Sequence, residues 1–268
     1  MELRSQTRAS SPRPPRASAG RIVLFMGAPG CGKGTQSSLL ASATGIDSIS
    51  TGEILRQAAQ ESTADGLRLR QIMASGGLVD DATVCDAVIS RIRNMQRGSG
   101  SLILDGFPRT LAQAKKLSRV LEALGIDPPL VLHLDVPTDI LVQRLTRRRQ
   151  CALCGAIYNL ASASLARCEA DGGPLIERAD DNEEVILKRL AAYEMETLPV
   201  LDYYRRGREG SYRRVDGCLT AAEIANDVRD IVLLDRAAPV ATWAGRIRSA
   251  PSQLSTSRIR SVPSGVTS

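Results

Sequence analysis

The sequence predicts an α/β protein built on a parallel β-sheet with helices on both faces. Short apolar runs at residues 22–26, 102–104 and 130–134 are each followed by a segment with helical character. Buried strands that alternate with helices are typical of a parallel sheet, because the chain must cross over between neighbouring strands. The first run leads into a glycine-rich turn, GAPGCGKGTQ at residues 27–36. Such sheets bind ligands at the carboxyl ends of their strands, where this turn lies.

The expected helices follow from apolar spacing and from stop signals. Within residues 81–97, apolar side chains recur three and four positions apart and form one stripe for a buried face. The segment before it ends at Gly76 and Gly77, because a glycine pair interrupts a helix. Together, the predicted helices cover residues 33–43, 51–60, 65–75, 81–97 and 221–233. Between about residues 147 and 181 the alternation stops, which indicates an inserted segment.

The turn at residues 27–36 has the composition of a phosphate-binding loop. Its glycines let successive backbone N–H groups point at an anion, and the following helix adds the positive end of its dipole. Lys33 stands where its ammonium group can reach the outer phosphates of a nucleotide. Gly34 occupies the position at which serine or threonine usually holds Mg²⁺, and the hydroxyl follows at Thr35. We therefore expect the chain to bind a nucleoside triphosphate.

The positive charge of the chain lies at its two ends. The 268 residues carry a formal net charge of +6, of which residues 1–20 contribute +3 and residues 236–268 contribute +5. The residues between them therefore carry −2 and offer no excess of positive charge to a nucleic acid. Both tails lack a helical or strand period, and we expect them to be disordered. A nucleic-acid-binding protein that works through these tails is the alternative from another functional class.

The sequence shows no signal for export or for insertion into a membrane. No segment has the apolar length of a membrane span, and the N-terminus lacks the apolar stretch of a secretory signal. We expect a cytoplasmic protein without a membrane partner. Organelle targeting by residues 1–20 is the alternative, which their arginines favour and their prolines disfavour.

A second motif, DGFPRTLAQ, covers residues 105–113 and begins where the predicted strand 102–104 ends. Asp105 is therefore expected in the same crevice as the phosphate-binding loop, where a carboxylate can bind Mg²⁺ through water. A helix N-cap would explain Asp105 by itself, but it would not explain the Gly-Phe-Pro-Arg run that follows.

Five motifs together resemble the adenylate kinase family, in its long-lid type. They stand in the order of the family and are GAPGCGKGTQ at residues 27–36, STGEILR at 50–56, GGLVD at 76–80, DGFPRT at 105–110 and RADDN at 178–182. The resemblance covers residues 21 to about 235. It implies a P-loop kinase core at residues 21–49, 80–146 and 182–235, a helical AMP-binding insertion at 50–79 and a lid at 147–181, with tails at 1–20 and 236–268.

The resemblance implies reversible phosphoryl transfer from Mg²⁺-bound ATP to AMP, which gives two ADP. Lys33 would act on the transferred group and Asp105 near Mg²⁺. ATP would be bound by Gly30, Cys31, Gly32, Lys33, Gly34, Thr35, Arg148, Ile157, Tyr158 and Leu219. The arginines implied in catalysis are Arg109, Arg144, Arg148, Arg178 and Arg189, which would clamp the phosphates when the lid closes. Another nucleoside-monophosphate kinase is the alternative within this class.

The AMP site implied by the resemblance combines the helical insertion with the second motif. Its residues would be Thr51, Arg56, Gly77, Leu78, Val79, Gly106, Phe107, Pro108, Arg109, Gln113, Arg178 and Arg189. Gln113 matches the family glutamine that reads the adenine edge, so AMP is the expected acceptor. Glu53, Gly77 and Leu219 depart from the family pattern, which predicts altered affinity without loss of activity.

The inserted segment carries a metal-binding pattern. Cys168 follows the motif CALC at residues 151–154 after thirteen residues, and Asp171 stands three positions further on. Two close pairs of ligands suit tetrahedral Zn²⁺, for which a carboxylate is an acceptable fourth ligand. The pattern resembles the zinc-bearing lid of many bacterial adenylate kinases, with Cys151, Cys154, Cys168 and Asp171 as ligands. Four protein ligands leave no open position, so the Zn²⁺ would be structural. The expected enzyme is a monomer that binds ATP, AMP and ADP and no nucleic acid.

Overall fold

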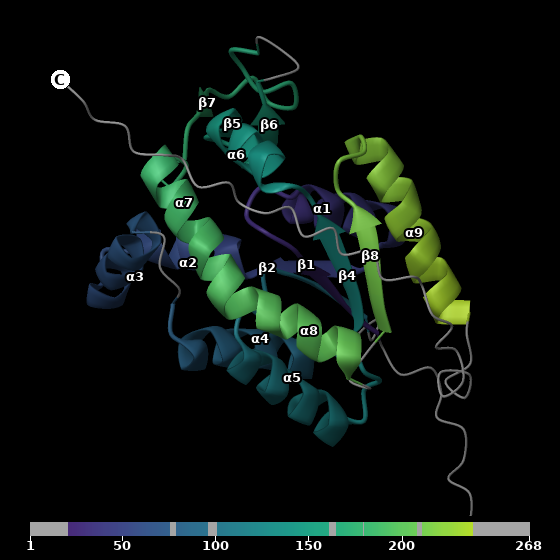
Figure 1. The fold of residues 1–268 in the computed structure, drawn as a ribbon. Coiled ribbons are helices and arrows are strands. Elements are labelled where there is room, and N and C mark those ends of the chain that lie inside the picture. The colour runs from purple at the N-terminus through teal and green to yellow at the C-terminus, as the bar shows by residue number, and fades with distance from the viewer. Residues whose placement is uncertain are drawn as a thin grey trace, which may run out of the picture.

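A computed structural model of the chain describes residues 21–75, 79–95, 101–160, 165–178, 180–207 and 211–237. The predicted tail 1–20, residues 238–268 of the second tail, and the predicted AMP-site residues Gly77 and Leu78 lie outside the described residues. Residues 236–237 of the predicted second tail belong to a helix. The described chain forms a central parallel sheet with helices on both faces and a small second sheet at one end (Figure 1). The predicted fold class is confirmed.

The central sheet has five parallel strands in the order β2-β3-β1-β4-β8. They are β1 (Ile22–Met26), β2 (Asp47–Ser50), β3 (Leu102–Asp105), β4 (Leu130–Asp135) and β8 (Ser211–Asp216). The three predicted apolar runs are the inner strands β1, β3 and β4. The sequence analysis does not identify β2 and β8, whose sequences, DSIS and SYRRVD, are largely polar. Both are edge strands, which bury fewer side chains and therefore lack a continuous apolar run.

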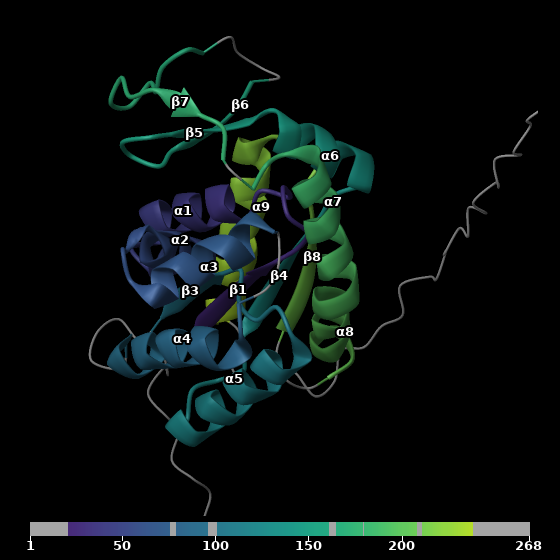
Figure 2. The ribbon, with the colours of Figure 1, turned by 90° about the vertical axis from the view of Figure 1, so that its left-hand side faces the viewer.

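Five of the helices lie where the sequence predicts them, with small differences at their ends. The helices of the core are α1 (Lys33–Thr44), α4 (Asp81–Met95), α5 (Leu111–Leu124), α6 (Thr138–Thr146), α7 (Glu183–Ala192), α8 (Leu198–Arg206) and α9 (Ala221–Ala237). A π-helical turn, Tyr193–Thr197, joins α7 to α8. Helices α4, α5 and α8 cover one face of the sheet, and α1 and α9 cover the other (Figure 2).

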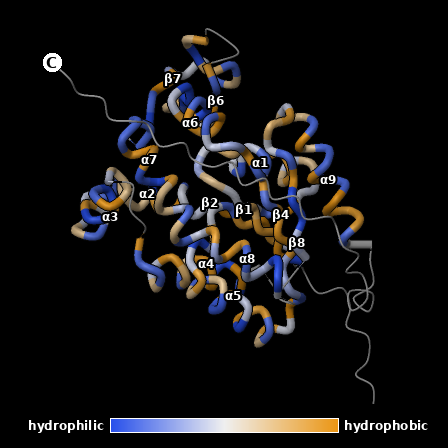
Figure 3. The backbone as a smooth tube through the Cα atoms, viewed as in Figure 1, coloured by the Kyte–Doolittle hydropathy of each residue, from blue (hydrophilic) through white to orange (hydrophobic). Residues whose placement is uncertain are grey.

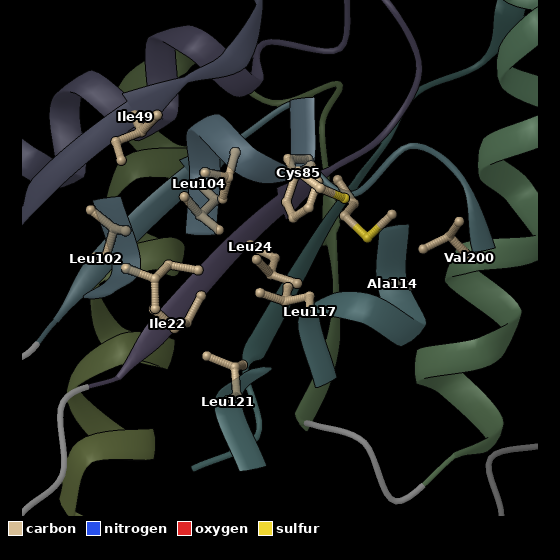
Figure 4. Packing of buried hydrophobic residues seen from close by; sticks show 14 of the residues in the cluster. Ile22, Leu24, Ile49, Cys85, Leu102, Leu104, Ala114, Leu117, Leu121 and Val200 are labelled. Atoms are coloured by element: carbon tan, nitrogen blue, oxygen red, sulfur yellow. The ribbon is translucent and has the colours of Figure 1, made fainter. Parts of the chain in front are cut away.

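Strand β1 is the centre of the core, because it pairs with β3 on one side and with β4 on the other. Alternate side chains of a strand point to opposite faces of its sheet. Ile22 and Leu24 pack with residues of α4, α5 and α8, among them Cys85, Leu117 and Val200 (Figure 4). The intervening side chains of β1 pack with α1, α6, α7 and α9 on the other face. Burial on both faces explains the continuous apolar sequence of this strand.

Two segments extend from the core, where the sequence predicts insertions. Helices α2 (Thr51–Gln60) and α3 (Ala64–Ala74) follow β2 and pack on each other. Between α6 and α7, the chain forms an antiparallel sheet in the order β6-β5-β7, with strands β5 (Arg148–Cys151), β6 (Ile157–Asn159) and β7 (Leu175–Ile176). We call it the small sheet. It lies on the side toward which the central strands run (Figure 1).

The outer helices are amphipathic. Figure 3 shows hydrophobic and hydrophilic stretches alternating along α9, as expected for a helix with one face on the core and one in water. Among the described residues, no helix combines the length and the apolar character that a membrane span requires.

Candidate active site

The phosphate-binding loop lies between β1 and α1, at the carboxyl edge of the sheet. Its glycines adopt backbone conformations that other residues rarely adopt, with φ of +144° at Gly27, +86° at Gly30 and +101° at Gly32. A Cβ atom on Gly27 would also lie only 2.5 Å from the Leu134 carbonyl oxygen. The loop therefore requires these glycines. The first N–H groups of α1 have no acceptor within the helix and can bind an anion.

Lys33 and Asp105 meet at this loop. Lys33 Nζ donates to the carbonyl oxygens of Gly27 and Ala28, at 2.7 and 2.9 Å. Asp105, the last residue of β3, places its carboxylate beside the first turn of α1, since a Cβ on Gly34 would be 3.4 Å from Asp105 Oδ2. The carboxylate thus lies at ordinary contact distance from the start of α1.

Both residues line one large cleft, with a volume of about 1060 Å³. This volume is at the upper end of the usual range for small-molecule sites. The acidic side chains of its described wall are Asp47, Glu53 and Asp105. The basic side chains of that wall are Lys33, Arg56, Arg91, Arg109, Arg144, Arg148, Arg178 and Arg189. A cleft lined mainly by one sign of charge concentrates ligands of the opposite sign, and a polyphosphate fits this requirement.

Asp181 holds two of these arginines. Its carboxylate is fully buried and accepts from Arg148 Nε at 2.7 Å and also from Arg148 Nη2. Arg189 Nη1 donates to Asp181 Oδ1 at 3.2 Å and to the Asp180 carbonyl oxygen at 2.9 Å. Because Arg148 lies on β5 and Arg189 on α7, Asp181 joins the small sheet to the core. The sequence analysis does not identify this role, although Asp181 belongs to the RADDN motif.

Burial and crowding change the titration of the cleft arginines. Burial lowers the pKa of Arg109 and of Arg189 below the usual arginine value. Burial, together with the positive charges of Arg148 and Arg56, lowers the pKa of Arg178 to about 10. These side chains nevertheless remain protonated at neutral pH, so the cleft keeps its positive charge.

The second motif connects to the start of α2. The buried Thr51 hydroxyl donates to the carbonyl oxygens of Gly106 and Asp105, at 3.0 and 3.2 Å. Arg109 Nε donates to the same Gly106 carbonyl oxygen at 2.9 Å. Gly106 has a φ of +78°, and a Cβ there would lie 3.0 Å from the Thr51 hydroxyl oxygen. This glycine therefore permits the close contact between the two segments.

Four predicted residues of the described chain do not line the cleft, namely Thr51, Val79, Phe107 and Gln113. Val79 and Phe107 belong to the apolar core. Gln113 is 3% exposed, and its amide is paired inside the protein. Its Oε1 accepts from the Arg109 N–H at 2.7 Å, and its Nε2 donates to Asp81 Oδ1 at 2.8 Å. The amide orientation of Gln113 is thus set by an acceptor on α4 that the sequence analysis does not identify.

All other predicted nucleotide-binding residues within the described chain line the cleft. They are Gly30, Cys31, Gly32, Lys33, Gly34, Thr35, Arg56, Gly106, Pro108, Arg109, Arg144, Arg148, Ile157, Tyr158, Arg178, Arg189 and Leu219. Arg91, Asn94 and Thr197 line it as well. No motif marks these three, so spacing along the chain could not have found them.

The predicted metal ligands lie together in the small sheet. The ligand atoms of Cys151, Cys154, Cys168 and Asp171 all lie within 4.8 Å of one another. Cys154 Sγ and Cys168 Sγ are 3.6 Å apart, and Cys151 Sγ is 3.3 Å from Asp171 Oδ1. Tetrahedral Zn²⁺ with bonds of about 2.3 Å to sulfur requires sulfur atoms about 3.8 Å apart, so the spacing fits. Gly173 N–H donates to Asp171 Oδ1 at 2.9 Å and orients the carboxylate.

A family model described as adenylate kinase matches residues 25–209. The chain belongs to the adenylate kinase family. The adenylate kinase of Thermodesulfovibrio yellowstonii is 42% identical over 209 residues, which cover 77% of this chain and 96% of the relative. That of Geobacter sp. strain M21 is 43% identical, again over 77% of this chain and 96% of the relative. That of Bacillus subtilis is 39% identical over 78% of this chain and 97% of the relative. The family predicted from the five motifs is confirmed.

For this member of the adenylate kinase family, the buried Asp181 predicts a large effect of a neutral substitution. Asp181→Asn leaves the largely buried Arg148 without its countercharge and Arg189 with only one carboxylate partner, Asp180 at 2.9 Å. The free energy of unfolding should fall by about 3 kcal/mol or more. Urea denaturation measures this. The control Glu184→Gln removes an exposed ion pair with Lys188, and should change stability by less than about 1 kcal/mol. If both substitutions lowered the free energy of unfolding equally, the large contribution that we expect from Asp181 would be disproved.

Proposed function

We propose that this chain transfers the terminal phosphoryl group of ATP to AMP and produces two ADP. The main support is that one cleft is lined by Lys33, Asp105 and the motif arginines. Phosphoryl transfer needs no covalent protein nucleophile. It needs two phosphate chains held in line and positive charge where negative charge develops. The cleft offers both.

ATP places its phosphates on the loop from Gly30 to Thr35. Lys33 exchanges its two carbonyl partners for the oxygens of the transferred group, so its ammonium meets the charge that develops during transfer. Asp105 and Thr35 would hold Mg²⁺, which supplies further neutralisation of phosphate charge when bound. Ile157, Tyr158 and Leu219 lie on the wall of the cleft and contact the nucleoside.

AMP binds between α2 and the second motif. Arg56 and Arg109 hold its phosphate, beside the connected group of Thr51 and Gly106. The two hydrogen bonds of the Gln113 amide use one of its N–H groups and one lone pair of its oxygen. The second N–H and the second lone pair bind the adenine edge. The resemblance to the family also assigns backbone contacts with AMP to residues 77–79, of which 77 and 78 lie outside the described residues.

The small sheet acts as the lid. It carries Arg148 on β5, and Arg178 follows directly after β7. Movement of the small sheet toward the core brings these charges onto the phosphate chain together with Arg144 and Arg189. It also excludes water, which would otherwise hydrolyse ATP.

Zn²⁺ bound by Cys151, Cys154, Cys168 and Asp171 stabilises the lid. The small sheet buries little apolar surface, since Leu153 is 71% exposed. A small unit without a substantial core requires an additional constraint, which a metal supplies. The metal has four protein ligands and therefore takes no part in the reaction itself.

We also propose a monomer in the cytoplasm. The described catalytic residues line one cleft within this chain, so the chemistry needs no second subunit. Cysteines with the spacing of metal ligands are typical of reducing compartments, where disulfides are rare.

A coupled assay with AMP, UMP, CMP and GMP as acceptors tests the reaction and its specificity. AMP should give the highest kcat/KM. Gln113→Ala should reduce the preference for AMP about tenfold, since a buried base edge left unpaired costs about 1–3 kcal/mol. Faster turnover of another monophosphate by the native enzyme would favour the alternative kinase. An unchanged preference in the folded variant would show that Gln113 does not read the base.

Lys33→Met should lower kcat about 100-fold or more and preserve the fold, because the side chain acts on the developing charge. Steady-state kinetics with ATP and AMP measures the change, and thermal unfolding checks the fold. The control Lys116→Met removes an exposed lysine that pairs with Asp86 on the surface, and should leave kcat unchanged. Turnover of the Lys33 variant within about tenfold of the native enzyme would contradict the assignment.

Protein purified without chelator should contain one zinc ion per chain. Cys168→Ala should release the metal and lower the midpoint of thermal unfolding, whereas Asp171→Ala should weaken the site less, because thiolates dominate zinc affinity. Elemental analysis and calorimetry measure both effects. Cys218→Ala is the control, since this exposed cysteine lies outside the cluster. Native protein free of zinc would disprove the metal site.

A further inference from the structure

Arg178 is paired differently from the other arginines of the cleft. Its Nε donates to the side-chain oxygen of Gln150, at 2.5 Å. Within the part of the chain that the structure describes, no carboxylate forms an ion pair with Arg178. Its charge is therefore oriented by a neutral amide.

The neighbouring cations have acidic partners. Arg148 is bound by the buried Asp181, and Arg56 pairs with Glu53 at 3.0 Å. Burial and the positive charges of Arg148 and Arg56 lower the pKa of Arg178. The carboxylates of Asp180 and Asp181 oppose this shift without forming an ion pair with Arg178 among the described residues. Of these three arginines, Arg178 is therefore the one whose charge has no directly bound carboxylate.

Gln150 lies on β5, opposite Ile157 of β6 and Ile176 of β7. It is absent from the described wall of the cleft, whereas Arg178 lies on that wall. In the turn between β5 and β6, Gly155 has a φ of +75°, and a Cβ there would lie at ordinary contact distance from Gln150 Nε2, at 3.4 Å. The turn therefore passes close to the Gln150 amide without crowding it.

We propose that Gln150 is a positioning residue that holds Arg178 toward substrate phosphate without neutralising it. The inference deepens the proposed function and rests on it, because it takes the phosphate chain of ATP as the partner of Arg178. The amide uses only the Nε–H of the guanidinium, which leaves the four terminal N–H donors for phosphate oxygens. A carboxylate at the same place would hold the group equally well, but it would compete with the phosphate for its charge.

The bond also fixes Arg178 to the small sheet. Gln150 and Arg178 both belong to the segment between α6 and α7, and their contact joins β5 to the residues that follow β7. When the small sheet moves as a lid, the amide keeps the guanidinium in a constant orientation relative to β5. The side chain therefore arrives at the phosphates already ordered, which reduces the entropy lost on binding.

Two substitutions separate orientation from charge. Gln150→Glu keeps the acceptor and adds a negative charge, and Gln150→Met keeps the length and removes the acceptor. Gln143→Glu is the matched control, because it adds the same charge on the exposed side of α6, outside the described wall of the cleft. For the full-length, zinc-containing protein, calorimetry measures the Kd of ATP with Mg²⁺, and thermal unfolding measures stability.

Gln150→Glu should raise the Kd of ATP about tenfold or more, while the unfolding midpoint stays the same or rises. If Gln150 only stabilised the fold, its substitution would weaken ATP binding and lower the unfolding midpoint together. Gln150→Met should also weaken ATP binding, by about tenfold, with normal zinc content, and Gln143→Glu should leave binding unchanged. If Gln150→Glu does not fold, the Kd of ATP for Gln150→Met tests the inference. The inference is wrong if the folded variants bind ATP within about twofold of the native protein, or if Gln143→Glu weakens binding as much as Gln150→Glu.

Arg178→Ala distinguishes this inference from the proposed function. If Arg178→Ala leaves ATP binding unchanged, Arg178 does not bind phosphate, and that part of the proposed function fails together with the inference. If Arg178→Ala weakens binding and the Gln150 variants do not, only the role of Gln150 is disproved.

Discussion

Mutual repulsion among the cations of one cleft is the constraint on which the rest of the structure depends. Two like charges about 4 Å apart repel by about 4 kcal/mol at the dielectric of a partly buried site. The protein holds five of these cations with partners of different kinds. Asp181 binds Arg148 and Arg189, Glu53 binds Arg56, two loop carbonyl oxygens bind Lys33, and an amide binds Arg178. A polyphosphate ligand relieves the repulsion that these partners leave uncompensated.

The parallel sheet brings these groups to one place. Strands β1 and β3 are neighbours and end at the same edge, so the phosphate-binding loop and Asp105 meet although about 80 residues separate them in the sequence. Apolar layers on both faces of β1 keep this edge rigid. Glycine at positions 27 and 106 then lets neighbouring groups approach more closely than a side chain at these positions would permit.

The small sheet, which we propose to move as a lid, has a different construction. It buries little apolar surface, and its described ties to the core include the buried pair between Arg148 and Asp181. Its own order comes from backbone pairing and from the cluster of three cysteines and one aspartate. A metal can hold such a unit together without fixing it to the core, so stability of the lid and freedom of the lid are compatible.

The sequence by itself determined the inner strands, five of the helices, the phosphate-binding loop, the metal ligands and the family. Each of these depends on residues that are close in sequence or on an apolar period, and such patterns can be read without a structure. Only the tertiary structure decided the edge strands β2 and β8, whose polar sequences conceal them. It also decided the partners of several polar side chains: Asp181 for Arg148, Gln150 for Arg178 and Asp81 for Gln113. These pairs join residues about 30 positions apart, and no local pattern marks them, because side-chain partners are chosen by packing in space.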